Sequence, residues 1–592
     1  MTTLSFSLAS ALPQWLRHYQ KAWLAGDLTA GLIVTVMLIP QSLAYALLAG
    51  LPPEMGLYAS ILPIVAYALL GSSMTLAVGP VAVASLMTAS ALAPFAAVGT
   101  TEYITLAVQL SLISGAMLLA FGALRLGFLA YFLSHPVISG FITGSAVVIA
   151  IGQLKYLLGV RVPSSSTWET LRGLVQALPH TNLTTLTLGL GSLVFLVVAR
   201  RYLAGWLVQL GTPAKVADLM TKLAPMAAVI VSIAVVALGR LDISAKVSVV
   251  GVVPQGLPHL GLELPGLSTL GQLWLPALLI SLVGFVESVS VAQSLALKRQ
   301  QRIAPNKELL GLGAANLASA LSGGYPVTGG FARSVVNFAA GANTPLAGVA
   351  SAALMALVIA TMTGAFYYLP HAVLAATIIV AVVSLVDFAT LKEAWRYDRA
   401  DALSLIATAL GVITMGVEVG ILMGVALSLG VLVWRSSRPH MAVIGRVPGT
   451  EHFRNIERHA VETVPGLLAL RVDESLFFAN ATALEERIEE LIHQDPTVRR
   501  VLLVCSAVNH MDTTALGVLT DMNTSLAKRG ITLELAEVKG PVMDRLQHTS
   551  LGQALQGRVF QSVHAAFNLS SIDISQSRPS NFTARQASTL AA

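Results

Sequence analysis

Long apolar runs separated by short polar loops occupy roughly residues 28 to 434 of this 592-residue chain, whereas the remainder carries charged residues at the density of a soluble protein. A helix that crosses a bilayer needs about 20 apolar residues, and the runs at 28–48, 104–124 and 275–297 reach that length. The pattern therefore predicts a membrane region followed by a soluble region, with the boundary near the sequence WRSSRPH at 434–440.

Two apolar stretches are too short and too rich in glycine and proline to form continuous spans. They are LAVGPVAVASLM at 76–87 and GGYPVTGGFARSVVNF at 323–338, and they occupy comparable places in the two halves of the membrane region. Paired broken segments are typical of inverted-repeat transporters, whose half-helices present N-terminal N–H groups to an anion near the bilayer midplane. We therefore predict fourteen segments, seven in each half. Their spans are 28–49, 57–70, 80–93, 103–124, 127–154, 183–199, 223–239, 275–297, 308–321, 331–341, 346–364, 371–386, 401–415 and 417–434.

The basic residues of the loops support this topology. With the N-terminus inside, the loops predicted to be cytoplasmic contain Arg125, Arg200, Arg201, Lys215, Lys222, Lys298, Arg299, Arg302, Lys307, Lys392, Arg396, Arg399, Arg435 and Arg438. The loops predicted to face outside contain Lys155, Arg161, Arg172, Arg240 and Lys246. This excess of positive charge on one side follows the positive-inside rule and predicts that both termini are cytoplasmic.

Composition excludes several other classes of protein. With 55% hydrophobic and 11% charged residues and a mean hydropathy of +0.74, the chain is no ordinary soluble globule. Its single cysteine, Cys505, rules out intramolecular disulfides and cysteine-based zinc clusters. The net charge of +6 is spread over loops, which argues against nucleic-acid binding. Residues 1–27 lack the pattern of a cleaved signal peptide and are predicted to be a cytoplasmic lead-in. No nucleophile, metal set or nucleotide motif supports an enzyme.

The soluble region predicts an α/β domain at about 448–568, after a linker at 435–447. The apolar run at 501–504 predicts a buried strand, and 515–528 carries apolar positions at helical spacing. The last segment, 569–592, has too few apolar residues to pack and is predicted to be disordered.

The sequence IPQSLAYALLAGLPPEMGLYAS at 39–60 closely resembles the first-helix signature of the sulfate permease (SulP) family of anion transporters and exchangers. VGPVAVASL, SLVGFVESVSVAQSLA, NKELLGLGAANLASAL and GGFARSVVN resemble the third, eighth, ninth and tenth segments of that family. The soluble region resembles a STAS domain, the module shared with anti-sigma factor antagonists. The resemblance implies a uracil-permease-like seven-plus-seven fold with core and gate domains, a homodimer and elevator-like alternating access. It also implies a cytoplasmic protein partner for the STAS domain.

Arg333 is a permanent cation in a region almost free of charge. It could pair with a carboxylate or cap backbone carbonyls, or it could bind an anion together with the helix that begins after Gly329 and Gly330. A charge at membrane depth costs about 2.5–3.5 kcal/mol on insertion scales, which favours the functional interpretation. In the family the neighbouring position is often serine. Here it is Ala332, which removes a hydroxyl donor and leaves the identity of the substrate open.

Glu287 is the other charge expected at membrane depth, in the sequence GFVESVS of the eighth segment. It could be a structural partner of Arg333. A carboxyl whose pKa is tuned by burial and by a neighbouring cation can also carry a proton, and the same carboxylate could take part in a sodium site. The resemblance implies a coupling-ion site at this position, for H+ or Na+, and no other cofactor.

Gln41 and Tyr45 lie four residues apart on one helical face, just after the helix-breaking residue Pro40. Helix packing alone could explain them. The resemblance implies that Gln41 supplies an amide donor and Tyr45 an aromatic wall with a hydroxyl beside the anion. It implies that Val81, at the start of the third segment, supplies an apolar wall next to backbone N–H groups.

In the soluble region, the sequence HMDTTALG puts Asp512 and Thr513 at the start of a helix. Helix capping is the favoured explanation. The signature of anti-sigma factor antagonists places a phosphorylatable hydroxyl here, so Thr513 is also a candidate phosphorylation site.

These features together predict a secondary active anion transporter in the inner membrane of a bacterium, with proton-coupled sulfate uptake as the leading function. Bicarbonate and C4-dicarboxylates such as succinate are the alternative substrates, and a passive exchanger or channel is the alternative mechanism. Arg333 disfavours a nucleobase permease with the same fold, because a nucleobase is uncharged.

Overall fold

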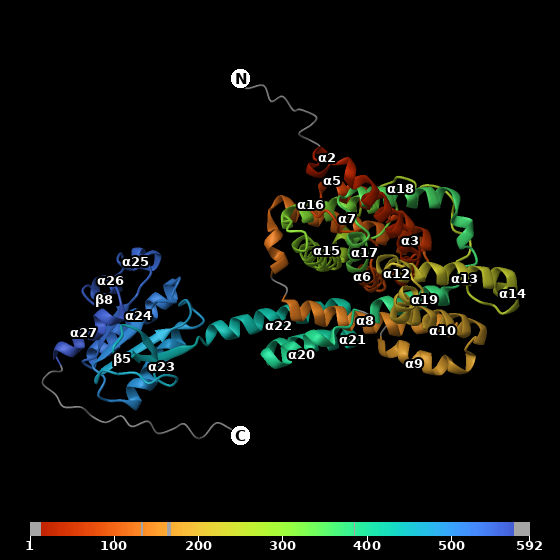
Figure 1. Cartoon of the computed structure of the whole chain (residues 1–592). Helices are drawn as coiled ribbons and strands as arrows, with labels where there is room; N and C mark the ends of the chain where they lie inside the picture. The colour runs from red at the N-terminus through yellow and green to blue at the C-terminus, as the bar shows by residue number, and fades with distance from the viewer. Residues whose placement is uncertain (1–12, 132–133, 163–166, 384, 574–592) are drawn as a thin grey trace. The chain divides into compact units, whose positions relative to one another are not determined.

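The computed structural model describes residues 13–131, 134–162, 167–383 and 385–573 (Figure 1). The chain divides into two compact units after Ser428. The first is almost entirely helical, and the second is an α/β domain built on one sheet.

Each of the fourteen predicted segments has a helical counterpart, and the last of these counterparts continues past Ser428 into the second unit. They are α3 (Leu24–Leu48), α4 (Pro53–Tyr58) with α5 (Leu62–Leu70), α6 (Ala82–Leu92), α7 (Thr101–Ala123), α8 (His135–Leu158), α10 (Leu183–Val198), α13 (Ala224–Gly239), α15 (Leu267–Leu297), α16 (Pro305–Leu321), α17 (Phe331–Ala339), α18 (Leu346–Thr361), α19 (His371–Val383), α21 (Arg399–Met415) and α22 (Val417–Ser437). Shorter helices are α2 (Gln14–Arg17), α9 (Thr167–Ala177), α11 (Ala204–Gln209), α12 (Ala214–Lys222), α14 (Leu241–Ser244) and α20 (Phe388–Tyr397).

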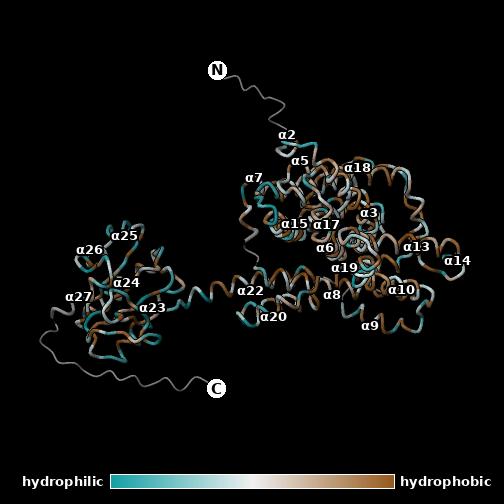
Figure 2. Tube along the Cα trace, in the orientation of Figure 1, coloured by the Kyte–Doolittle hydropathy of each residue, from teal (hydrophilic) through white to brown (hydrophobic). Residues whose placement is uncertain are grey.

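Length and apolar composition identify the membrane-crossing helices. Among the described residues, eight helices are long and apolar enough to span a bilayer, and a bent pair of helices, Val216–Lys222 with Ala224–Gly239, would make a ninth. Figure 2 shows apolar positions running along these helices. The two segments predicted to be broken, α6 and α17, have 11 and 9 residues. At about 1.5 Å per residue neither can cross a membrane alone.

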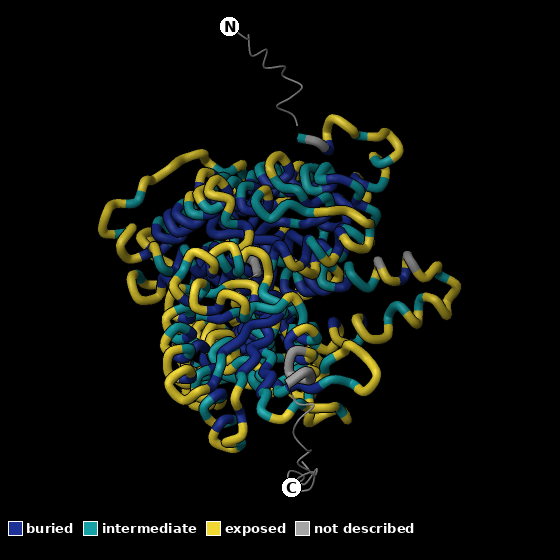
Figure 3. The backbone as a smooth tube through the Cα atoms, turned by 90° about the vertical axis from the view of Figure 1, so that its left-hand side faces the viewer, coloured by how far each residue is buried: buried dark blue, intermediate teal, exposed yellow. Residues whose placement is uncertain are grey.

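Helices from the two halves of the unit pack against one another. Helix α16 packs on α5 and α7, α18 packs on α3, and α15 packs on α7, whereas α8 packs on α19 and α21 and α10 packs on α19. Small residues permit the closest of these contacts. A Cβ added to Gly115 of α7 would lie 2.8 Å from the backbone N of Leu317, and one added to Gly313 of α16 would lie 2.8 Å from the backbone N of Leu119. Figure 3 shows the buried positions gathered in the interior of the helical unit.

Pro40 does not break its helix. Helix α3 runs through Pro40 from Leu24 to Leu48. The proline therefore removes one backbone hydrogen bond without ending the helix, and Gln41 and Tyr45 stay on one continuous surface.

The second unit contains a six-stranded sheet in the order β4-β3-β5-β6-β7-β8. The strands are β3 (Met441–Arg446), β4 (Phe453–Asn455), β5 (Leu467–Val472), β6 (Arg500–Val504), β7 (Thr532–Ala536) and β8 (Val559–Phe560). Strands β5 to β8 are parallel, and β3 is antiparallel to β4 and β5. The helices of this unit are α23 (Ala481–Gln494), α24 (Thr513–Lys528), α25 (Gly540–Leu546), α26 (Ser550–Ala554) and α27 (Val563–Asp573).

The strand predicted at 501–504 lies in the centre of this sheet as β6. Val501 and Leu503 belong to the apolar cluster that contains α23 and α24, whereas Leu502 and Val504 belong to the cluster that contains α27. Because successive side chains of a strand alternate between faces, a strand buried on both faces is apolar throughout. The predicted helix at 515–528 corresponds to α24.

The boundaries of the α/β domain differ from those predicted. Helix α22 continues to Ser437, and β3 pairs with β5 from Met441 onward. Residues 441–446 therefore belong to the sheet rather than to a linker at 435–447, and the domain starts before residue 448. Helix α27 extends to Asp573, and 574–592 of the predicted tail lie outside the described residues, as do residues 1–12 of the lead-in.

Candidate functional site

Two short strands bring the broken segments together. Strand β1 (Val78–Gly79) pairs antiparallel with β2 (Thr328–Gly329), with Val78 opposite Gly329. Gly79 has a φ of 151°, a conformation that side chains disfavour. Helix α6 begins three residues after β1 and α17 two residues after β2, so both helix N-termini start next to the crossing, the pair formed by β1 and β2.

Side chains from α15 and α16 hold the crossing in place. Ser288 Oγ accepts a hydrogen bond from Gly329 N at 2.9 Å and lies 2.8 Å from Thr328 Oγ1. The Asn316 amide donates to Val327 O at 2.9 Å and accepts from Val327 N at 3.0 Å. The short strands are therefore fixed by buried hydrogen bonds as well as by their own pairing.

The two helices start without side-chain caps. Val81 is the N-cap residue of α6 and Gly330 that of α17, and neither side chain accepts a hydrogen bond from the first turn. The first N–H groups of a helix have no partner within it and carry partial positive charge. Two such ends at one crossing favour an anion.

Arg333, the third residue of α17, adds a full positive charge to this crossing. Its side chain is buried, and Nη1 donates to Pro80 O at 2.5 Å. Nε and Nη2 are buried without a hydrogen-bond partner. A Cβ added to Gly330 would lie 3.1 Å from Nη2, so the guanidinium lies directly against the backbone of the crossing. Two N–H groups of the arginine are thus available to an external acceptor, and leaving buried donors unpaired costs free energy.

The other predicted anion-site residues lie on elements around Arg333. Helix α3 packs against α6 and α17. Tyr45 is 8% exposed and within electrostatic reach of Arg333. In the part of the chain that the structure describes, neither the Tyr45 hydroxyl nor the Gln41 amide makes a hydrogen bond. Val81 is buried, and a Cβ added to Gly330 would lie 3.1 Å from its Cγ1, whereas Ala332 is exposed.

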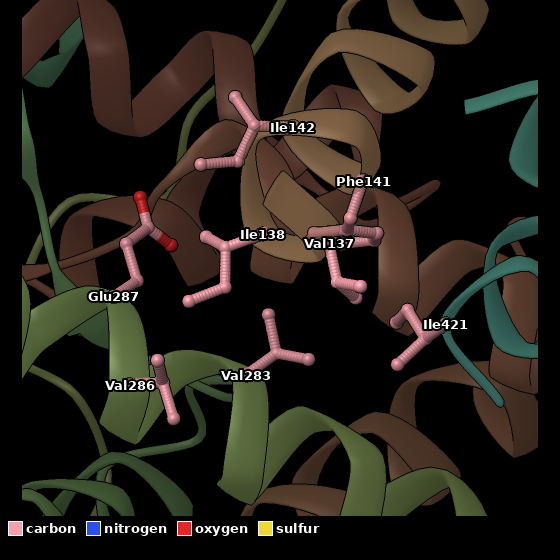
Figure 4. Close-up of a pocket in the computed structure, with 8 residues that line it drawn as sticks. All are labelled: Val137, Ile138, Phe141, Ile142, Val283, Val286, Glu287 and Ile421. Atoms are coloured by element: carbon pink, nitrogen blue, oxygen red, sulfur yellow. The ribbon is translucent and has the colours of Figure 1, made fainter. Parts of the chain in front are cut away.

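Glu287 on α15 lies within electrostatic reach of Arg333 but is not bonded to it. Its half-buried carboxylate has no hydrogen-bond or ion-pair partner within the described ranges, so a direct pair with Arg333 is not formed. It lies at the edge of a small cavity of about 20 Å³ (Figure 4). The remaining lining is apolar and comes from α8, α15 and α22: Val137, Ile138, Phe141, Ile142, Val283, Val286 and Ile421.

Tyr325 is a residue of this site that the sequence patterns did not predict. It is fully buried, its hydroxyl lies 3.1 Å from Ser85 Oγ, and it is within electrostatic reach of Arg333. Its position in GGYPVTGG, inside the broken segment that carries Arg333, is the sequence feature that could have identified it.

The C-terminal end of α17 is also held by charged groups that were not predicted. Arg299 Nη1 donates to Ala342 O at 2.6 Å, and its guanidinium lies 4.4 Å from the ring centre of Phe338. Asp27, fully buried at the start of α3, accepts hydrogen bonds from the backbone N of Asn343 and Thr344 at 2.6 and 3.0 Å. The helices that carry Glu287 and Tyr45 are therefore tied to the helix that carries Arg333 at the end opposite the crossing.

A second buried carboxylate, that of Glu308, also accepts hydrogen bonds from backbone and side-chain donors. It accepts hydrogen bonds from the Tyr67 hydroxyl at 2.6 Å and from the backbone N of Ser72 and Ser73 at 2.9 Å each. It joins the start of α16 to the end of α5 and has a structural role.

In the α/β domain, Asp512 is the N-cap of α24. Its Oδ1 accepts from Ala515 N at 2.8 Å and its Oδ2 from Phe478 N at 2.9 Å. The hydrogen bond from Ala515 N lowers the pKa of the carboxyl. The favoured explanation of this motif, helix capping, is therefore confirmed. Thr513 is exposed beside a cavity of about 420 Å³ that His510 and Arg545 also line.

Cys505 is buried in the core of the α/β domain, and burial raises the pKa of its thiol to about 12. A thiol that stays protonated is unreactive. Across the described residues, no group of three His, Cys, Asp or Glu side chains could hold a metal ion.

Two family descriptions match the sequence, the sulfate permease family over residues 24–408 and the STAS domain over 458–566. A protein named "Probable sulfate transporter" of Mycobacterium tuberculosis is 35% identical over 537 residues, which cover 90% of this chain and 93% of that protein. The chloroplastic sulfate transporter 4.1 of Arabidopsis thaliana is 34% identical, over 88% of this chain and 76% of its own length.

Solved structures share the fold. The murine Solute Carrier 26 family member A9 anion transporter, in its inward-facing state, superposes with a TM-score of 0.88 at 23% identity, covering 96% of each chain. The transmembrane domain of the cyanobacterial bicarbonate transporter BicA gives a TM-score of 0.58 at 25% identity, covering 68% of this chain and 98% of that domain.

Proposed function

Because the chain belongs to the sulfate permease family and carries a STAS domain, we propose that it is a secondary active transporter that takes up sulfate together with protons. The relatives named as sulfate transporters support this substrate. An anion carrier, rather than an enzyme, is the function that suits a buried cation between two helix N-termini.

The observation that carries the proposal is that Arg333 has buried N–H donors without an acceptor. Its Nε and Nη2 are buried and unpartnered at the crossing where α6 and α17 begin. A tetrahedral oxyanion can accept from both N–H groups and from the backbone N–H groups of the helix starts. The free Tyr45 hydroxyl and Gln41 amide complete a set of donors around one anion.

Glu287 is the proposed site of the coupling proton. A dianion that enters an inside-negative cell at 100 mV is opposed by about 4.6 kcal/mol, so accumulation needs a coupled cation. Sodium sites in such transporters use carbonyl oxygens of unwound helices, whereas the cavity beside Glu287 is apolar apart from the carboxylate. A volume of about 20 Å³ holds one water, which can deliver a proton.

Transport would proceed by elevator-like alternating access, in which the helices around the crossing move against the remaining helices. Helices α7, α15 and α16 pack together and reach α3 and α18 through α5, whereas α8 packs on α19 and α21 and α10 on α19. This packing supports such a division, with a contact between α3 and α19 joining the two groups. The protein would act as a homodimer in the inner membrane, with both termini cytoplasmic. The excess of basic residues in the predicted cytoplasmic loops supports this orientation.

The STAS domain would bind a cytoplasmic protein and regulate transport. Thr513 is exposed on the first turn of α24, beside the cavity that Arg545 lines. A phosphate on Thr513 would add negative charge at a helix N-terminus next to an arginine, a favourable position for it.

Bicarbonate is the second candidate substrate, because the BicA transmembrane domain matches the fold over nearly its whole length. The exposed methyl group of Ala332 offers no hydroxyl donor to either anion. Counterflow in proteoliposomes distinguishes the two. Vesicles are loaded with unlabelled sulfate, bicarbonate, succinate or chloride, and trace labelled sulfate or bicarbonate is added outside. We expect transient accumulation of labelled sulfate in sulfate-loaded vesicles. Accumulation of labelled bicarbonate alone would replace sulfate by bicarbonate, and failure of both labels would reject the proposal.

A further inference from the structure

Two short amphipathic helices occupy equivalent connections in the two halves of the helical unit. Helix α9 joins the fifth segment, α8, to the sixth, and α20 joins the twelfth segment, α19, to the thirteenth, α21. Because the two halves are predicted to be inverted repeats, these connections are expected on opposite sides of the membrane.

The contacts place the two helices toward opposite ends of α8. Helix α9 follows the C-terminal end of α8 and packs on it. Asp387, which caps α20, lies within electrostatic reach of His135, the first residue of α8. Helix α8 has 24 residues and is about 36 Å long, slightly more than the hydrocarbon core of a bilayer. The two helices therefore lie at the levels of the two membrane surfaces.

Helix α20 has an apolar face that the protein does not cover. Phe388 and Trp395 are 73% and 50% exposed, and together with Leu391 they recur at the helical spacing of one face. No residue of α20 is buried, although the helix packs on α21 and α8 (Figure 1). Hydrogen bonds from Ala389 N and Thr390 N to Asp387 fix its start.

Basic side chains flank this apolar face. Lys392 and Arg396 are exposed, four residues apart, and neither has an ion-pair or hydrogen-bond partner in the described part of the chain. Arg399 is exposed just beyond the helix, and Glu393 is the single acidic residue of α20. The segment 388–399 thus carries three exposed cations next to aromatic side chains, with Glu393 and Asp398 as its acidic residues.

Helix α9 has a similar apolar face without the excess charge. Trp168 and Val175 are 75% and 66% exposed, and its charged residues, Glu169 and Arg172, balance each other. Helix α9 therefore carries no net charge, whereas α20, which Asp387 and Asp398 flank, carries one net positive charge. This difference matches a bilayer whose cytoplasmic leaflet is anionic.

We propose that α20 is an interfacial helix that binds anionic phospholipid of the cytoplasmic leaflet, an inference that rests on the proposed orientation. Phe388 and Trp395 enter the boundary between headgroups and acyl chains, and Lys392, Arg396 and Arg399 contact lipid phosphates. Because α20 packs on α21 and α8, this contact fixes those two helices relative to the membrane surface.

The test measures lipid affinity of the full-length chain by native mass spectrometry, with phosphatidylglycerol or phosphatidylcholine titrated into the detergent. The variant Lys392→Gln/Arg396→Gln removes two charges from α20. The matched control Arg161→Gln/Arg172→Gln removes two charges from the connection at the other end of α8. Each basic group near an anionic surface changes affinity about fivefold, so we expect the α20 variant to bind phosphatidylglycerol roughly 30-fold more weakly. We expect no such change in the control or for phosphatidylcholine. Equal affinity in wild type and α20 variant, or an equal loss in the control, overturns the proposal.

A second measurement tests the depth of the helix and does not depend on charge. The protein is reconstituted into phosphatidylcholine–phosphatidylglycerol (3:1) nanodiscs with and without brominated acyl chains. The fluorescence difference between wild type and Trp395→Phe isolates the signal of Trp395. We expect bromine to quench this difference signal, whereas an unquenched signal means that a second copy, the STAS domain or water covers the helix, and the proposal is wrong.

Discussion

Substitution of Asp27 should loosen the C-terminal end of α17, the helix that carries Arg333. Four donors share the Asp27 carboxylate, and three of them follow α17: Asn343 N at 2.6 Å, Thr344 N at 3.0 Å and Thr344 Oγ1 at 2.7 Å. The fourth is the Tyr19 hydroxyl, at 3.3 Å. A hydrogen bond to a charged group contributes about 1.5–3 kcal/mol, and a buried N–H left without an acceptor costs a similar amount. Asn343 is half-buried, so water replaces part of what is lost. We expect Asp27→Ala to lower the local stability of the loop at 340–345, which follows α17, by about 3 kcal/mol.

Amide hydrogen exchange of the full-length chain measures this change directly. A loss of about 3 kcal/mol corresponds to a roughly 150-fold fall in the protection of the Asn343 and Thr344 amides. Asp27→Asn keeps one acceptor oxygen and should lower protection about tenfold. The control is Asp218→Ala, which removes an aspartate whose ion-pair partner is Lys222 of its own helix, at 2.7 Å. It should leave the loop unchanged.

The functional effect should be smaller than the change in exchange. Helix α17 has nine residues and is about 13 Å long, so Arg333 lies about two turns from the released loop. Sulfate affinity should fall in Asp27→Ala, but less than protection does, because the hydrogen bonds of the crossing still hold the N-terminal end. If the Asn343 and Thr344 amides of Asp27→Ala were as protected from hydrogen exchange as those of the wild type, packing alone would fix α17. That result would refute this reasoning.

Three other changes test the coupling site and the soluble domain. Glu287→Gln should abolish proton-driven sulfate accumulation in proteoliposomes while exchange at equal concentrations persists, and accumulation by this variant under an imposed proton gradient would place coupling elsewhere. Asp512→Ala should destabilise the first turn of α24 by about 1 kcal/mol at neutral pH, measured by hydrogen exchange. Because the pKa of Asp512 is lowered in the folded state, its contribution is complete above about pH 5 and declines as pH falls below about 4, so a difference that does not change with pH contradicts the capping role. Truncation after residue 440 should preserve sulfate binding, measured by calorimetry, because the anion-site residues lie upstream, and a stable truncation that cannot bind would contradict this.

The spans of the helical unit could be predicted from the sequence because apolar length and the breaks at Gly-Pro and Gly-Gly are local signals. The broken segments also identified Arg333, since a lone cation in an apolar stretch is conspicuous. Asp27 and Glu308 could not be recognised, because their roles depend on donors 316 and 236 residues away in the chain. In the sequence, a carboxylate near the end of an apolar run cannot be distinguished from an exposed carboxylate of a loop.

Local patterns did not predict where the α/β domain starts. Strand β3, MAVIGR, is six residues long and follows α22 after only three residues, so the sequence offered no clear start for the domain before residue 448. Pro40 is a helix-breaking residue, but the predicted segment 28–49 runs through it and so does α3, whose neighbouring turns are buried among other helices.

The central claim is that Arg333 binds the transported anion, and calorimetric titration of the purified protein with sulfate tests it most directly. Two charge-assisted hydrogen bonds from Nε and Nη2 contribute about 3–6 kcal/mol, so Arg333→Ala should weaken binding at least 100-fold. Arg333→Lys keeps the charge but loses the planar fork and should also be impaired. Arg302→Ala, which removes an exposed arginine, should bind as the wild type does. The account predicts loss of sulfate binding in a folded Arg333→Ala protein, and sulfate binding of wild-type affinity in that protein would contradict it.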